Sequence, residues 1–200
     1  KGGVGKTFMA ITLASAFAQA GKRTLLVDGD LGLANVDVQL GIAPETDLAA
    51  VIAGWVELDD AVTAVDGGAA DGGFDVLPGR SGSGALAELP PEEVARLAAG
   101  LSALALQYDQ VVVDLGAGIN QAESRAAGQR TYEAIARACQ TFLGFRPHLA
   151  GTVMRDPKVR DAIRCQKTLI STDQQAQPIQ DAIAISQMLI GARQGVDIGY

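Results

Sequence analysis

The sequence predicts a doubly wound α/β domain with a mostly parallel sheet, formed as a single domain over residues 1–200. Three observations predict it. Short apolar runs rich in Val and Leu end in aspartate, segments with helical spacing separate them, and a glycine-rich turn precedes the first helical segment. Hydrophobic residues make up 48% of the chain and aromatic residues only 4%, so we expect a core of aliphatic side chains.

The glycine-rich turn is the heptapeptide KGGVGKT at residues 1–7. Glycines let successive backbone N–H groups point inward at phosphate oxygens, and the following helix presents its partially positive N-terminus to the same anion. We therefore expect Lys6 to reach the β- and γ-phosphates of a nucleotide and Thr7 to bind Mg²⁺. A flexible turn that binds nothing is disfavoured, because each position has a role in binding phosphate. The backbone of the other residues is expected to line the phosphates: Gly2, Gly3, Val4 and Gly5.

The first acidic strand follows this helix. Residues 7–20 carry apolar side chains at helical spacing, and Gly21 is placed to end the helix. Residues 23–27 end in a short, continuous apolar run, which is typical of a parallel strand covered on both faces. It leads into Asp28 and Asp30 at its carboxyl end, the edge of a doubly wound sheet where ligands bind. Each aspartate has a local alternative, which is to cap a loop or the next helix.

A second acidic strand is expected over residues 108–114. It has the Walker B pattern, a β-branched run that ends in Asp114, and we expect this carboxylate to hold a Mg²⁺-bound water. Between the two acidic strands we expect, in order, short helices over residues 47–62, a loop over 65–73, a strand over 74–77 and a helix that starts at Pro90.

Charge and cysteine content restrict the class of protein. The net charge of −7 argues against DNA as a partner, although a local basic patch stays open. Cys139 and Cys165 lack the C-x-x-C spacing of a metal or redox site, so we expect both to be buried, and Trp55 is likewise expected in the core. No apolar run approaches the roughly 20 residues that cross a bilayer, and no secretory leader is recognised, so we expect a cytoplasmic protein.

A family resemblance rests on three motifs. The lysine at position 1 makes KGGVGKT similar to the deviant Walker A signature of the ParA/MinD group of dimeric ATPases. The segments LGLANVD at 31–37 and DLGAGI at 114–119 resemble the MinD branch, especially the flagellar-number regulators called FlhG, FleN or YlxH. The resemblance covers essentially the whole chain. It implies a SIMIBI-type P-loop NTPase fold that binds ATP or ADP with Mg²⁺ and hydrolyses ATP slowly to ADP and phosphate.

The same resemblance implies roles for individual residues and partners. Lys1 would reach across an ATP-dependent homodimer to the nucleotide of the second subunit, Asp30 would support the attacking water, and Asp28 would organise Mg²⁺. The implied partners are a second copy of the chain, a flagellar GTPase similar to the signal-recognition particle, and flagellar switch-complex proteins. A peripheral contact with the inner face of the cell membrane is also implied.

Two parts of the expected sheet are missing from the sequence. A parallel strand needs a crossover of a dozen or more residues before the next strand, yet Ile119 leads directly into the polar Asn120. No strand precedes Lys1, although the glycine-rich turn should follow a central strand. We therefore expect that the sequence lacks the first strand and, between Ile119 and Asn120, a βα segment on the order of 30 residues or more.

The second half of the chain contributes the expected base-binding residues. Asn120 resembles the family's asparagine at a strand end, whose amide matches the paired donor and acceptor of adenine, with a helix cap as the alternative. By resemblance, Arg155 and Asp156 follow a last strand over residues 149–154 and contact adenosine; the basic residues after them are expected to form a solvated helix face, with a partner site as the alternative. Two helices are expected here, over residues 130–143 and, packed on the sheet, over 179–190.

Three rival functions share parts of this pattern. A ParA-type ATPase that partitions DNA or other cargo has the same turn but is expected to carry a more basic surface. Iron–sulfur carrier ATPases also use KGGVGKT, and they are disfavoured because neither cysteine lies in a cluster-bridging motif. The third rival is an ATP-bound scaffold that hardly turns over.

Overall fold

A four-stranded sheet forms the centre of the fold. The computed structural model describes residues 5–29, 34–79, 90–114, 124–143, 146, 148–165 and 168–194. The strand order is β2-β3-β1-β4, with β1 paired in parallel to β3 and to β4, and β2 antiparallel to β3. The predicted mostly parallel sheet is therefore confirmed. The strands are β1 (Thr24–Asp28), β2 (Thr63–Val65), β3 (Phe74–Leu77) and β4 (Gln110–Asp114).

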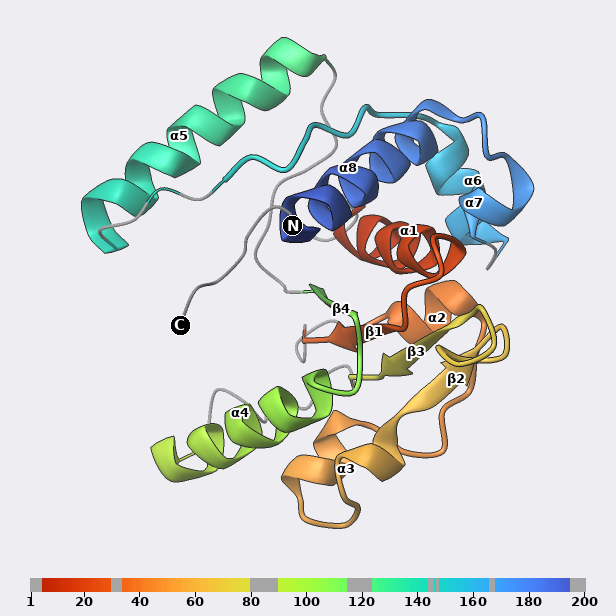
Figure 1. Ribbon diagram of the computed structural model, residues 1–200, viewed down its shortest axis with the longest axis vertical. Coiled ribbons are helices and arrows are strands. Elements are labelled where there is room, and N and C mark those ends of the chain that lie inside the picture. Colours follow the sequence, from red (N-terminus) through yellow and green to blue (C-terminus); the bar gives the residue numbers. More distant parts are fainter. Residues whose placement is uncertain are drawn as a thin grey trace.

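Helices cover both faces of this sheet. Figure 1 shows α1 above the sheet, α3 and α4 below it, and α8 lying on the far side of α1. The helices are α1 (Lys6–Gln19), α2 (Val36–Leu40), α3 (Leu48–Ile52), the 3-10 turn η1 (Asp59–Ala61), α4 (Pro91–Ala105), α5 (Arg125–Leu143), α6 (Lys158–Arg164), α7 (Leu169–Thr172) and α8 (Gln177–Gln194). This layering is the doubly wound architecture that the sequence predicts.

Alternate residues of the strands enter two separate cores. Leu26 and Val76 face α1, together with Phe74, which is one of the largest fully buried side chains. Leu25 and Leu77 point the other way, into a core that α3, η1 and α4 close. Since both faces are covered, β1 is buried at all five positions, and this explains why its central residues, 25–27, are continuously apolar rather than alternating.

Helix α1 is buried on two sides. Ala10, Ile11 and Ala14 pack against the sheet, while Phe8 and Ala16 pack against α6, α7 and α8. The C-terminal helix was expected on the sheet, and this expectation was wrong. Helix α8 covers α1 instead, because α1 carries a second apolar surface that the sheet cannot reach.

Two predictions of strands need correction. Strand β2 was missed, because the sequence between α3 and β3 was interpreted as helix followed by loop. The predicted strand over residues 149–154 does not join the described sheet. Within this segment only Met154 forms a β-bridge, and its backbone N–H donates to the Oδ2 of Asp181 in α8 at 2.9 Å.

Two predictions of burial were also wrong. Trp55 is 76% exposed, and Cys165 is exposed as a free thiol at the end of α6. The side chain of Cys139 lies outside the part of the chain that the structure describes. None of the helices among the described residues combines the length and the apolar character that crossing a membrane requires.

The predicted strand before Lys1 and the predicted segment after Ile119 stay predictions, since both positions lie outside the described residues. Among the described strands, β4 is the last in the sheet order. Its Val113 is 51% exposed, so this edge of the sheet has room for a further strand.

Candidate functional site

The start of α1 is built to receive an anion. Gly5 holds the left-handed conformation at φ 83° and ψ 17° as the residue that begins the helix, which a side chain at this position would resist. No side chain caps the helix and no acidic residue lies in its first turn. The first backbone N–H groups of a helix have no intrahelical partner, so here they are directed at whatever binds beyond Gly5. Of the predicted phosphate-binding residues, Lys1, Gly2, Gly3 and Val4 lie outside the described residues.

The two strand-end aspartates lie side by side. Asp28 of β1 is the register partner of Asp114 of β4, and the exposed fractions of these residues are only 1% and 5%. The backbone N–H of Gly29 donates to the carbonyl oxygen of Asp114 at 2.8 Å, which extends the pairing of the two strands past their carboxylates. Parallel pairing therefore brings together two acidic residues that are 86 positions apart in the sequence. Asp30 lies outside the described residues.

Topology brings the start of α1 to the same edge of the sheet. Only residues 20–23 join the end of α1 to the start of β1, so the helix runs back across the sheet in the direction opposite to β1. A helix of 14 residues is about as long as the strand it covers, by the usual rise per residue. Lys6 and Thr7 therefore start the helix at the edge where Asp28 and Asp114 end their strands.

Asp28 also has a structural role. Its Oδ2 accepts the backbone N–H groups of Asn35 and Val36, both at 3.1 Å, at the start of α2. The local alternative, in which this aspartate caps the next helix, therefore applies to one of its oxygens. The carboxylate ties the segment that enters α2 to the edge of the sheet, and its predicted role toward Mg²⁺ stays a prediction.

Gly79, the second residue after β3, is required by close packing at this edge. A Cβ atom at this position would lie 2.8 Å from the carbonyl oxygen of Asp28, 3.3 Å from its Cγ and 3.0 Å from the Cβ of Ala34. We expect Gly79→Ala to displace Asp28 and to lower the free energy of unfolding by about 1–2 kcal/mol, because the nearest atom, the carbonyl oxygen of Asp28, belongs to the backbone of a buried strand. Urea denaturation followed by circular dichroism measures this change.

A matched control for this substitution is Gly191→Ala, in α8, where an added Cβ would meet no atom within 4 Å. We expect this control to raise the free energy of unfolding by about 0.5 kcal/mol through helix propensity. Equal effects of the two alanines would contradict the packing argument at Gly79.

The predicted base-binding loop lies before α6. The Oδ1 of Asp156 accepts the backbone N–H of Lys158 at 2.8 Å, so one of its oxygens caps the helix. The Nζ of Lys158 donates to the Oδ2 of Asp173 at 2.6 Å, and this hydrogen bond lowers the pKa of the Asp173 carboxyl and raises the pKa of the Lys158 amine. Arg155 is exposed beside this cap. The contacts of Arg155 and Asp156 with adenosine stay predictions, and Asn120 lies outside the described residues.

Sequence reasoning missed Asp181, which anchors the chain before this loop. The residue is 5% exposed, and its Oδ1 accepts hydrogen bonds from Arg125 Nη2 at 2.9 Å and from Gln177 Nε2 at 3.0 Å. Its Oδ2 accepts the Met154 N–H. One buried carboxylate therefore joins α5, α8 and the segment that leads into Arg155. An aspartate between apolar positions of the C-terminal helix was the available signal.

The side chains of this site suit Mg²⁺ better than they suit a metal ion whose ligands all come from the protein. Among the described residues, no group of three or more His, Cys, Asp and Glu side chains is placed to hold one ion. The oxygen atoms at this edge that suit a metal ion belong to the carboxylates of Asp28 and Asp114 and to the hydroxyl of Thr7. Mg²⁺ is typically bound by one or two carboxylates with phosphate and water oxygens completing its shell, so the residues present fit a magnesium nucleotide.

Comparisons with known proteins agree with this geometry. Antiactivator FleN of Pseudomonas aeruginosa is 44% identical over 119 residues, which are 60% of this chain and 41% of FleN. The flagellum site-determining protein YlxH of Helicobacter pylori is 33% identical over 123 residues, 60% of this chain and 39% of YlxH. The match thus spans about two fifths of the length of these curated relatives.

Solved structures share the fold. The cell division ATPase MinD of Pyrococcus furiosus superposes with a TM-score of 0.73 at 18% identity, covering 96% of this chain and 95% of MinD. The MinD of Pyrococcus horikoshii, solved with Mg-ADP, gives 0.70 at 20% identity, covering 98% and 96%. Residues 1–169 match the family model described as the CobQ/CobB/MinD/ParA nucleotide binding domain. The chain therefore belongs to the CobQ/CobB/MinD/ParA family of nucleotide-binding domains.

Proposed function

We propose that this chain is a Mg²⁺-dependent ATPase switch that forms a homodimer with ATP and regulates flagellar number or placement. The observation that carries the proposal is the meeting of three features at one edge of the sheet. These are the uncapped start of α1 after a Gly-Lys-Thr sequence, the buried Asp28, and its neighbour Asp114. The similarity to FleN and YlxH supports the flagellar role.

The residues have separate tasks in this proposal. Lys6 and the first backbone N–H groups of α1 bind the phosphates, and Thr7, Asp28 and Asp114 hold Mg²⁺ directly or through water. When bound, the metal neutralises the charge that develops on the phosphate oxygens. Asp30 orients the water that attacks the γ-phosphate in line with the departing ADP.

The second subunit completes the site. Lys1 of each chain donates its cationic amine to the nucleotide bound by the other, so that two chains face each other while ATP is present and separate after hydrolysis. We further propose that the dimer acts in the cytoplasm and at the inner face of the membrane. Its proposed partners are a flagellar GTPase similar to the signal-recognition particle and proteins of the flagellar switch complex.

Light scattering of molecular mass with ATP, with ADP and without nucleotide tests the switch. We expect a dimer only with ATP, a persistent dimer for Asp30→Ala because hydrolysis is blocked, and no dimer for Lys1→Ala. Lys22→Ala removes a lysine at the other end of α1, beyond its last residue, and should dimerise normally. A mass that does not respond to ATP, or an equal loss for Lys22→Ala and Lys1→Ala, would contradict the proposal. Phosphate release compared between the unsubstituted chain and Asp30→Ala tests turnover.

A further inference from the structure

A groove opens on the face of the sheet opposite α1. It has a volume of about 320 Å³ and lies between α4 and the segment formed by α3 and the turn after it. This size is at the lower end of the range for ligand pockets, roughly 300–1,000 Å³, and leaves room for a few side chains of a partner. Its apolar lining comes from Val51, Ile52, Val56, Leu58 and Leu97.

These lining residues are the outer part of a core. All five are only partly buried, and they pack against the fully buried Leu25, Leu48 and Leu77 beneath them. Gly100 leaves the α4 wall of the groove without a side chain, and a Cβ there would make an ordinary contact with the Cδ2 of Leu58 at 3.5 Å. The apolar core therefore reaches the surface here, and a ligand that enters the groove continues it.

Trp55 lies between Gly54 and Val56, which both line the groove, on a turn closed by backbone hydrogen bonds. Helix α3 ends in a Schellman motif, in which the Trp55 N–H donates to the Ala50 carbonyl at 3.0 Å and the Gly54 N–H donates to the Val51 carbonyl at 2.9 Å. Gly54 has a φ of 72°, which completes the motif. Such a turn commonly folds its last side chain back on the helix, yet the indole here is 76% exposed. An indole with a fixed backbone and a free face is suited to anchor a partner at low entropic cost.

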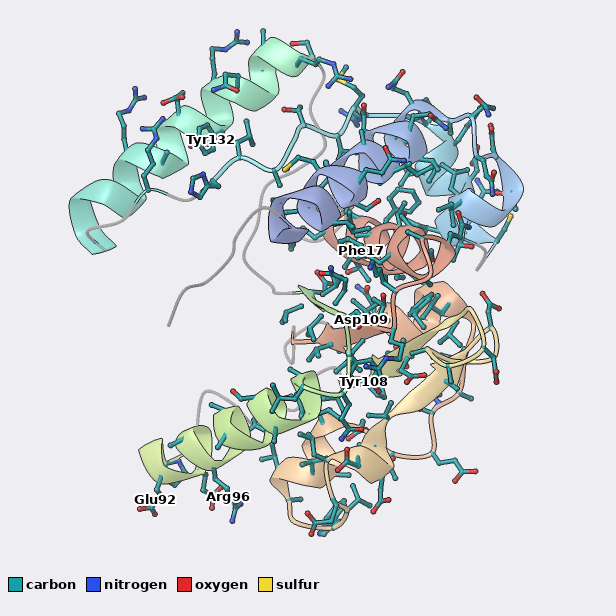
Figure 2. All side chains as sticks on the ribbon, in the orientation of Figure 1. Phe17, Glu92, Arg96, Tyr108, Asp109 and Tyr132 are labelled. Atoms are coloured by element: carbon teal, nitrogen blue, oxygen red, sulfur yellow. The ribbon has the colours of Figure 1, made fainter. Side chains whose placement is uncertain are left out.

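The charges around the groove select the partner. Glu57, Glu93 and Arg96 line it, and Glu92 is the neighbour of Glu93 in the first turn of α4. Figure 2 shows Glu92 and Arg96 projecting outward from α4. The exposed Asp59 and Asp60 follow the lining residue Leu58. Acidic groups thus outnumber the basic Arg96, and the rim attracts a cation.

We propose that this groove binds a short basic segment of a partner protein, with an aliphatic side chain between α3 and α4, lysine or arginine at the acidic rim, and Trp55 packed over it. The groove faces away from α1, so its occupant does not compete with a nucleotide at Lys6. The inference is independent of the proposed ATPase function.

Trp55 makes the test direct, because it is the only tryptophan in the chain. The probe is a synthetic amphipathic peptide composed of leucine and lysine alone, titrated into the full chain while tryptophan emission is recorded. We expect a saturable shift to shorter wavelength as the indole leaves water. A leucine and glutamate peptide of the same length and order should give no shift, and neither should anionic lipid vesicles.

Two charge reversals separate the groove from general electrostatic attraction. Glu57→Lys and Asp71→Lys change the net charge equally, and both residues are exposed in turns, but Asp71 lies in the turn between β2 and β3. We expect Glu57→Lys to weaken the binding of the leucine and lysine peptide about tenfold. Asp71→Lys should weaken it less than twofold. Calorimetric titration of Trp55→Ala with the same peptide should show an affinity about thirtyfold lower than that of the unsubstituted chain.

Three results would overturn the proposal. They are the absence of any emission shift with the basic peptide, equal binding of the acidic peptide or of vesicles, and equal losses for the two charge reversals. Circular dichroism establishes that each variant is folded. Trp55→Ala and both reversals alter exposed side chains, so each is expected to keep the fold.

Discussion

The Lys6→Ala substitution is expected to weaken the binding of Mg-ATP by about a hundredfold or more. A lysine that touches two phosphate groups makes charge-assisted hydrogen bonds worth about 1.5–3 kcal/mol each, and about 3 kcal/mol corresponds to roughly a hundredfold in affinity. Lys6 is the first residue of α1, so its side chain starts beside the N–H groups that are proposed to bind the same phosphates. Equilibrium dialysis with ATP and Mg²⁺ measures the loss.

The matched control is Lys22→Ala, which removes the same charge just beyond the other end of α1. It should bind Mg-ATP within twofold of the unsubstituted chain. If Lys6→Ala retained full affinity while remaining folded, the glycine-rich turn would not be the phosphate site. If both variants lost affinity equally, general charge rather than contact would explain the effect.

The Asp181→Ala substitution is expected to lower the free energy of unfolding by about 2–3 kcal/mol. It removes the acceptor of three hydrogen bonds, from Arg125, Gln177 and the Met154 backbone. The side chain of Arg125 is 67% exposed and would be hydrated in the variant. The larger penalty for a buried charge without a partner therefore does not apply. The backbone N–H of Met154 would lose its hydrogen-bond acceptor, so the segment before Arg155 should loosen. Urea denaturation measures the change.

Asp161→Ala is the control for this effect. Asp161 also pairs with an arginine, Arg164, but both side chains are mostly exposed and 4.0 Å apart, so its loss should change the unfolding free energy by less than about 0.5 kcal/mol. An equally small effect of Asp181→Ala would mean that the buried network does not hold the loop. If Arg155 contacts adenosine, Asp181→Ala should also weaken ATP binding severalfold under conditions where the protein is folded.

Local patterns predicted the elements around the site correctly. The spacing of Phe8, Ile11 and Ala14 defines α1, and the continuous apolar run before Asp28 defines β1, because a strand covered on both faces is mostly apolar. Asp114 ends β4 as predicted. Each of these signals lies within one segment, so no knowledge of the neighbouring segments was needed.

The wrong predictions concern residues whose surroundings are distant in the sequence. Trp55 has the composition of a core residue, but the turn after α3 directs it outward. Residues 149–154 have the pattern of a strand, but the carboxylate of Asp181 binds the Met154 N–H there. Cys165 is small and lies in a helical segment, yet it follows the last turn of α6 on an exposed face.

The sequence by itself determined helices α1 and α4, strands β1, β3 and β4, the turn that suits phosphate, and the presence of an aspartate at the end of two strands, since these follow from periodicity and backbone freedom within a few residues. Only the tertiary structure decided that Asp28 and Asp114 are register partners, that Gly79 must lack a side chain beside them, and that Asp181 holds the chain before Arg155. Each of these depends on the packing of segments far apart in the chain, which no local pattern records.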